Sequence, residues 1–131
     1  MSIIYTTSTH MAYRLVTIDA GRSEELRERC SALNYYTMKA DIFGVCVQLH
    51  TESKDYIDMW ADNFYQMSDS VRSHARIFCL DDASTDLHAE YDVATRTMFL
   101  FNFDYYGWIK SIALGMAGNI LEDAHSIHSV H

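Results

Sequence analysis

The sequence contains no proline and few cysteines, and both scarcities narrow the kinds of protein that it can encode. Its 131 residues include no Pro, which excludes proline-rich linkers and proline-rich recognition segments. The three cysteines, Cys30, Cys46 and Cys79, are odd in number, lie far apart and include no CxxC pair. Neither a disulfide framework nor a zinc knuckle is therefore predicted, and we expect reduced thiols that are mostly buried.

Glycine is also scarce, and the glycine-dependent catalytic motifs are missing. The glycines are Gly21, Gly44, Gly107, Gly115 and Gly118. They form neither the GxSxG turn that carries a nucleophilic serine nor the GxxxxGK[ST] loop that holds nucleotide phosphates. We therefore predict no catalytic residue and no cofactor for this chain.

Basic residues are also few, and the sequence contains no long apolar run. The chain has 10 Lys and Arg against 18 Asp and Glu, a formal charge of -8, which repels nucleic acid and anionic membrane surfaces. The nearly apolar run 108–121 is interrupted by Lys110 and Asn119 and is shorter than the roughly 20 residues that span a bilayer. The N-terminal segment lacks the basic and apolar regions of a secretory signal. We expect a cytoplasmic protein with no membrane or nucleic-acid partner.

The apolar content of 49% is enough for one packed core, so residues 1–131 are predicted to form a single domain. The most regular strand pattern lies at 43–50, where apolar residues alternate from Phe43 to Leu49. Alternating or apolar runs bounded by turn residues predict further strands at 11–19, 75–80, 87–93 and 96–103. The last three runs are separated by short polar turns, which predicts an antiparallel meander.

Three segments show helical spacing of apolar residues, at 23–33, 54–67 and 104–123. Ser23 is the expected N-cap of the first helix and Asp104 that of the third. The predicted fold class is therefore α+β, a largely antiparallel sheet with about three helices packed against it. Gly107, Ser111 and Gly115 recur every four residues on the third helix, a ridge of small side chains that another backbone can approach closely.

Two groups of side chains can form sites in the middle of the chain. Asp81, Asp82 and Asp86 with His88 can coordinate a cation or act in acid-base chemistry, although such a stretch is more often a solvated turn. A set of aromatic residues can line a ligand pocket, form core or mark an interface. Its members are Tyr35, Tyr36, Trp60, Phe64, Tyr105, Tyr106 and Trp108.

The chain ends in HSIHSVH, which places His125, His128 and His131 three residues apart. These histidines are the candidate metal ligands. A zinc site needs three or four ligands within tetrahedral reach, and neither a helix nor a strand brings the three imidazoles together by itself. The same pattern is also that of a polar terminal segment.

The segment NFDYYGWIKSIALGMAGNILEDAHSIHSVH resembles the lead-in to the phosphate loop of the HPr kinase/phosphorylase and phosphoenolpyruvate carboxykinase-like group. In that group a Val-His or Met-His pair begins a strand ahead of the phosphate loop, and Val130-His131 match this pair. The resemblance implies that 125–131 is a strand leading toward an absent nucleotide-binding domain. It also implies that His131 lies beside the nucleotide site and that ATP and Mg bind only to a full-length protein.

On this interpretation the chain is the non-catalytic N-terminal domain of an ATP-dependent HPr kinase-like protein. Its role is substrate recognition, regulation or oligomerisation, and its partner is its own C-terminal kinase domain or another subunit. Two alternatives stay open. One is a free-standing protein-interaction module that binds another protein, or itself as a homo-oligomer, through the glycine ridge. The other is a metal-binding protein that uses the terminal histidines.

Overall fold

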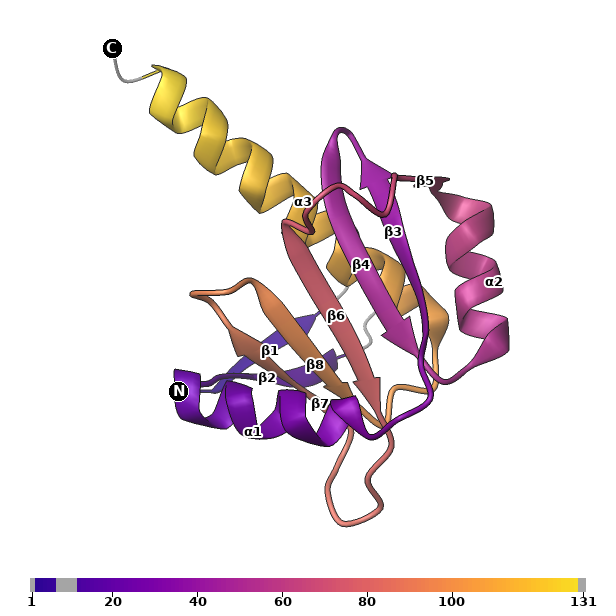
Figure 1. The fold of residues 1–131 in the computed structure, drawn as a ribbon. Coiled ribbons are helices and arrows are strands. Elements are labelled where there is room, and N and C mark those ends of the chain that lie inside the picture. The colour runs from indigo at the N-terminus through magenta and orange to yellow at the C-terminus, as the bar shows by residue number, and fades with distance from the viewer. Residues whose placement is uncertain (1, 7–11, 130–131) are drawn as a thin grey trace.

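One mixed sheet with helices on both faces organises the described part of the chain (Figure 1). The computed structural model describes the backbone of residues 2–6 and 12–129 and the side chains of residues 13–124. Its strands are β1 (Ser2–Thr6), β2 (Ala12–Thr17), β3 (Tyr36–Ile42), β4 (Val45–Thr51), β5 (Tyr65–Gln66), β6 (Ala75–Leu80), β7 (His88–Asp92) and β8 (Thr97–Phe101). Its helices are α1 (Ala20–Ser31), α2 (Lys54–Asn63) and α3 (Tyr106–Ser129).

The strands follow the order β1-β2-β7-β8-β6-β4-β3-β5 across the sheet. The α+β class is confirmed, and the sheet is mixed, with four antiparallel and three parallel pairings among the described strands. Strands β4, β6 and β8 are adjacent and parallel, and β2 is parallel to β7. The remaining neighbours are antiparallel. Because α2 lies between β4 and β6 in the chain, the connection crosses over and returns the next strand in the same direction.

The predicted meander of 75–80, 87–93 and 96–103 is wrong in its order. Strands β7 and β8 do form an antiparallel hairpin, but β6 pairs with β8 in parallel, with Leu80 opposite Phe101. The chain passes over β8 after β6 and places β7 beside β2. The short turns indicated strand ends correctly but could not specify which strands became neighbours.

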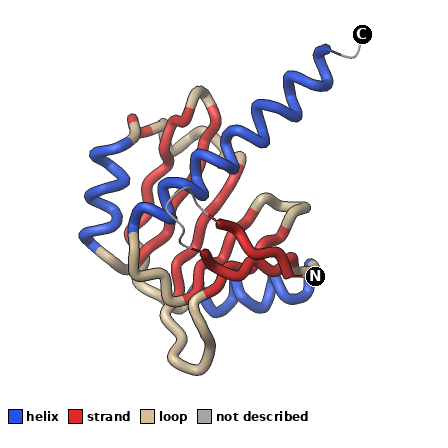
Figure 2. Tube along the Cα trace, turned by 180° about the vertical axis from the view of Figure 1, so that it is seen from behind, coloured by secondary structure: helices blue, strands red, loops and turns tan. Residues whose placement is uncertain are grey.

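The two faces of the sheet carry different helices. Alternating residues of β8 show this directly: Met98 and Leu100 belong to the core under α2 and α3, whereas Phe99 and Phe101 pack with Leu26 of α1. Helix α1 lies in front of the sheet in Figure 1. Figure 2 shows α3 running across the opposite face and α2 beside it.

Local hydrogen bonds shift the helix boundaries from their predicted positions. Helix α1 begins at Ala20 because Asp19, not Ser23, is the N-cap, its Oδ1 accepting from the Arg22 amide at 2.9 Å. Helix α2 ends at Asn63 instead of 67 because the next residues, Tyr65–Gln66, pair with β3.

The terminal segment also differs from prediction. Residues 125–129, expected as part of a strand over 125–131, continue α3 as far as Ser129. A helix satisfies its own backbone groups and extends readily from a turn that is already packed, whereas a strand needs a neighbour. Residues 130–131 and the side chains of His125, His128 and His131 lie outside the described residues, so the metal site stays a prediction. None of the described helices is long and apolar enough to cross a membrane.

Candidate functional site

The carboxyl ends of the parallel strands β4, β6 and β8 meet at one rim of the sheet, the usual position of ligand sites in parallel sheets. Helices α2 and α3 begin at the same rim. Between them lies a hollow of about 390 Å³, which we call the acidic cleft. Its lining residues are Thr51, Glu52, Ser53, Asp55, Tyr56, Met59, Cys79, Leu80, Asp81, Phe103 and Asp104.

A second, shallower hollow of about 530 Å³ adjoins the cleft, and we call it the tyrosine groove. It shares Tyr56, Met59 and Asp104 with the acidic cleft, so the two hollows form one continuous surface. Its lining residues are Tyr56, Met59, Asp62, Asn63, Asp104, Tyr105, Tyr106, Gly107 and Lys110.

The charge of this surface is predominantly negative. Lys110 is the only basic residue among those that line it, against five acidic residues: Glu52, Asp55, Asp62, Asp81 and Asp104. None of these five carboxylates forms an ion pair with a described residue. Several carboxylates elsewhere are ion-paired, as Asp58 is with Lys54 at 2.5 Å. A hollow lined by charges of one sign focuses the field and attracts the opposite charge.

Cys79 lies on the wall of the acidic cleft but is poorly suited to thiol chemistry. Burial raises the pKa of its thiol to about 12, and the nearby Asp81 carboxylate acts in the same direction. Since the thiolate is the reactive form of cysteine, the group is a neutral thiol at physiological pH. The cleft is therefore better suited to binding than to nucleophilic catalysis by Cys79.

Asn102 fixes the loop that carries Asp81 into the cleft. Its side-chain Oδ1 accepts from the Asp82 amide at 2.7 Å, and its Nδ2 donates to the carbonyl oxygens of Asp82 at 2.8 Å and Thr85 at 3.0 Å. Its own φ is 63°, a left-handed conformation that asparagine tolerates better than most residues. The loop between β6 and β7 is thereby fastened to the end of β8.

Of the acidic residues that the sequence grouped with His88, only Asp86 contacts it, with Oδ1 3.2 Å from Nδ1 of His88 and 2.7 Å from Nη2 of Arg14. Asp81 faces the cleft, and Asp82 pairs with Arg29 at 3.1 Å. Hydrogen bonds from Ser84 and Arg29 lower the pKa of Asp82 to about 2. Among residues 13–124, no group of three or more His, Cys, Asp or Glu side chains is placed to hold a metal ion.

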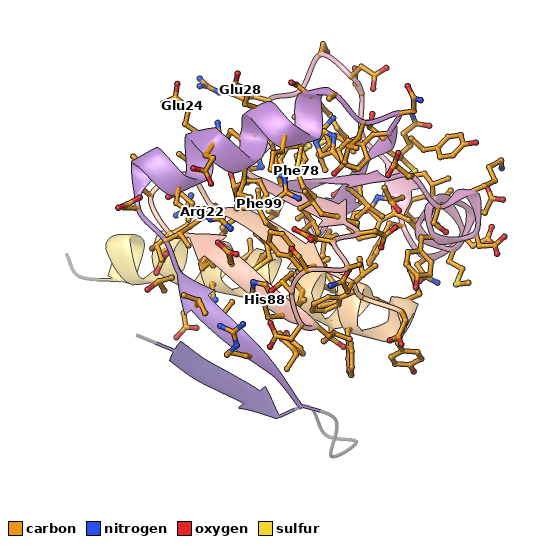
Figure 3. The ribbon with its side chains drawn as sticks, turned by 90° about the horizontal axis from the view of Figure 1, so that it is seen from below. Arg22, Glu24, Glu28, Phe78, His88 and Phe99 are labelled. Atoms are coloured by element: carbon orange, nitrogen blue, oxygen red, sulfur yellow. The ribbon has the colours of Figure 1, made fainter. Side chains whose placement is uncertain are left out.

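His88 belongs to a buried network under α1, on the other face of the sheet (Figure 3). Its ring stacks on Phe101 with centroids 4.6 Å apart. Its Nε2 lies 2.9 Å from Oε2 of Glu90, and that carboxylate also accepts from Arg22. These contacts join α1 to β7, so His88 has a structural role in the fold.

The predicted aromatic set divides between core and site. Trp60 and Trp108 are buried in the core, Phe64 packs edge-on against Trp60, and Tyr35 lies near Phe78 under α1. Tyr36 is 46% exposed. Only Tyr105 and Tyr106 line the groove.

The sequence did not single out Glu52, Asp55 and Tyr56 as site residues. The one feature that could have indicated them is their position at the junction between a strand and the first turn of a helix. That signal becomes useful only when the strands are known to be parallel, since only then do such junctions meet at one rim.

Comparison with known proteins yields no match to any family model, to any curated sequence or to any solved structure. The resemblance to the HPr kinase group therefore stays a prediction. Its matching pair, Val130-His131, lies outside the described residues.

Proposed function

We propose that this chain is a protein-interaction module whose acidic cleft and tyrosine groove bind a positively charged polypeptide segment. The observation that carries the proposal is the set of five carboxylates, described above, that line one continuous surface without a basic partner. Such a surface has a field complementary to a basic segment and speeds its association.

The other lining residues favour a polypeptide over a small inorganic cation. Met59 is 41% exposed and Tyr105 is 55% exposed, and Tyr and Met are residue types enriched in protein interfaces. The two hollows together extend from the end of β6 along α2, as far as Asn63 at its end, and to the first turn of α3. If the chain is part of a kinase-like protein, the same surface would serve substrate or domain recognition.

Fluorescence anisotropy with a labelled oligolysine peptide tests the proposal, with an oligoglutamate peptide of equal length and opposite charge as the reference. We expect binding of the basic peptide alone, and weaker binding as NaCl rises from about 50 to about 300 mM, because salt screens exposed charges. The double variant Asp81→Asn/Asp104→Asn should weaken binding about tenfold, roughly 0.7 kcal/mol for each lost exposed pair.

A matched control removes the same charge from the other face of the sheet. Glu24 and Glu28 are exposed on the outer side of α1 (Figure 3). The variant Glu24→Gln/Glu28→Gln therefore removes as many negative charges as the cleft variant does, without changing the cleft. This control should keep at least half of the wild-type affinity. Equal losses in the two double variants, or no binding of the basic peptide by the wild-type chain, would contradict the proposal.

A further inference from the structure

We infer that the tyrosine groove receives the alkylammonium group of a lysine side chain, methylated lysine included, and thereby makes the module prefer lysine to arginine. This inference rests on the proposed function and names the residue that the basic partner must present. It follows from the arrangement of Tyr56, Tyr105 and Tyr106 around the groove.

The aromatic walls come from two helices. Tyr56 lies in the first turn of α2, and Tyr106 begins α3. Their ring centroids are 6.0 Å apart and the ring planes are inclined by 51°. The two rings therefore pack against each other on one side of the groove, with Tyr106 9% exposed, and an aromatic face attracts an ammonium group within about 6 Å of its centroid.

Hydrogen bonds hold both rings in place before any ligand arrives. The Tyr106 hydroxyl donates to Oδ1 of Asn63 at 2.8 Å, and the Tyr56 hydroxyl donates to the Phe103 carbonyl oxygen at 3.4 Å. Burial raises the pKa of Tyr106 to about 12, so its ring is neutral. A pre-ordered wall loses little conformational entropy on binding, and Asp62 and Asp104 supply the negative charge.

Tyr105 completes the groove, and Gly107 makes room for it. The Tyr105 ring packs edge-on against Trp108, with centroids 5.9 Å apart. A Cβ placed on Gly107 would lie 2.4 Å from Cε2 of that ring, so any other residue at 107 must displace it. Glycine near a helix start costs up to ~1 kcal/mol relative to alanine. The close approach of the Tyr105 ring explains why residue 107 is nevertheless a glycine.

The groove is better suited to an ammonium than to a guanidinium group. Arginine gains most from a planar, two-pronged contact with one carboxylate, whereas the two groove carboxylates, Asp62 and Asp104, come from different elements. Trimethylation of lysine keeps the charge and removes every N–H donor. A site built on aromatic faces retains such a ligand, whereas a site built on hydrogen bonds to carboxylates loses it.

The experiment compares basic peptides that differ only at one central position, which is Lys, trimethyl-Lys, acetyl-Lys or Arg. Isothermal titration calorimetry with the full chain should give trimethyl-Lys an affinity equal to or above that of Lys. The Arg peptide should bind at least threefold more weakly and the acetyl-Lys peptide at least tenfold more weakly, because acetylation removes the charge.

Two variants assign the preference to the groove. Gly107→Ala should reduce affinity for the Lys and trimethyl-Lys peptides about fivefold and leave the Arg peptide within twofold, while thermal stability is kept or increased. Tyr105→Leu should do the same, whereas Tyr65→Leu, which changes a tyrosine that is 87% exposed on β5, should change no affinity.

The outcomes separate the two proposals. Binding of all charged peptides with equal affinity, unchanged by Gly107→Ala and by Tyr105→Leu, overturns the lysine preference and leaves the basic-segment function standing. Loss of affinity on trimethylation of more than about tenfold also overturns it. Failure of every basic peptide to bind the wild-type chain overturns both.

Discussion

The guanidinium of Arg22 lies against the carboxylate of Glu90, with Nε 2.9 Å from Oε1 and Nη2 3.1 Å from Oε2. The Glu90 side chain is 9% exposed and the Arg22 side chain 37%. The same carboxylate contacts His88. This contact joins the start of α1 to β7 and provides the positive partner that a buried carboxylate requires.

Replacement of Arg22 by methionine should destabilise the fold. The substitution keeps much of the side-chain volume but leaves Glu90 without its two-pronged partner, and the free energy of unfolding should fall by about 2 kcal/mol. Urea denaturation measures the change. Arg72→Met, at an exposed arginine, is the matched control and should stay within ~0.5 kcal/mol of wild type; equal losses would contradict the assigned role of the pair.

Stability should fall with acid because Glu90 and Asp92 have lowered pKa values in the folded chain. Burial opposes ionisation of both, but hydrogen bonds from Arg22 and His88 outweigh it at Glu90, and hydrogen bonds from Thr95 contribute at Asp92. Above pH 4.5, the ordinary pKa of Glu90, its contribution is fully present. Below that pH the unfolded chain binds protons first, so stability declines until the folded-state carboxylate is itself protonated.

Urea unfolding between about pH 6 and pH 2.5 measures this decline. Glu90→Gln cannot titrate and should show a shallower pH dependence below pH 4.5, whatever its stability at neutral pH. A slope identical to that of wild type would show that Glu90 does not contribute to acid sensitivity.

Asn102 combines a left-handed backbone with four side-chain hydrogen bonds to the loop after β6, and two substitutions separate these contributions. Asn102→Gly accepts the positive φ but loses the hydrogen bonds, whereas Asn102→Ala loses both. We expect both variants to be less stable than wild type, and the free energy of unfolding of Asn102→Ala to be about 1 kcal/mol lower than that of Asn102→Gly. Thermal unfolding followed by circular dichroism gives the order, and equal stability of the two would contradict the backbone contribution.

Gly115 on α3 has open space around it. A Cβ added there meets no atom within 4 Å, so Gly115→Ala should raise the free energy of unfolding by about 0.5 to 1 kcal/mol through helix propensity. Gly44→Ala is the contrasting variant: the φ of Gly44 is +85°, in the turn between β3 and β4, and alanine there should cost about 1 kcal/mol.

The Gly115→Ala result also tests the predicted homo-oligomer. If Gly107, Ser111 and Gly115 form a ridge against a second chain, alanine at 115 should weaken association. Sedimentation velocity at two protein concentrations distinguishes the outcomes. A stabilised chain with unchanged sedimentation argues against the ridge as an interface, whereas loss of a larger species supports it.

The sequence predicted helix and strand positions well where side-chain periodicity is strong. Strand β6 occupies the predicted 75–80, and Ser53 caps α2 at the predicted start. Strand β3 was missed, although Met38, Ala40 and Ile42 alternate with polar residues in the period-two pattern of a strand. The apolar pattern of a segment indicates which of its residues are buried, but it does not show the pairing with β4 that holds β3 in the sheet.

The site was harder to predict than the fold class because it depends on contacts between distant segments. Asp81 and Asp104 are separated by two strands in sequence and reach one cleft because β6 and β8 are parallel and also direct neighbours. In the predicted meander both ends would lie at the same rim, but β7 would separate β6 from β8 by two strand spacings, roughly 10 Å. The tyrosines gave a partial signal, since the aromatic set included Tyr105 and Tyr106 before their position was known.

The parallel alignment of β4, β6 and β8 separates the parts of the chain that determine stability from those that determine recognition. Core residues such as Leu49, Ile77 and Leu100 lie within the strands, whereas Glu52, Asp81 and Asp104 follow the ends of β4, β6 and β8. Substitutions at the rim can therefore change which ligand is chosen while the interior packing is preserved. The sheet thus offers a scaffold on which selection, natural or in the laboratory, can alter specificity one loop at a time.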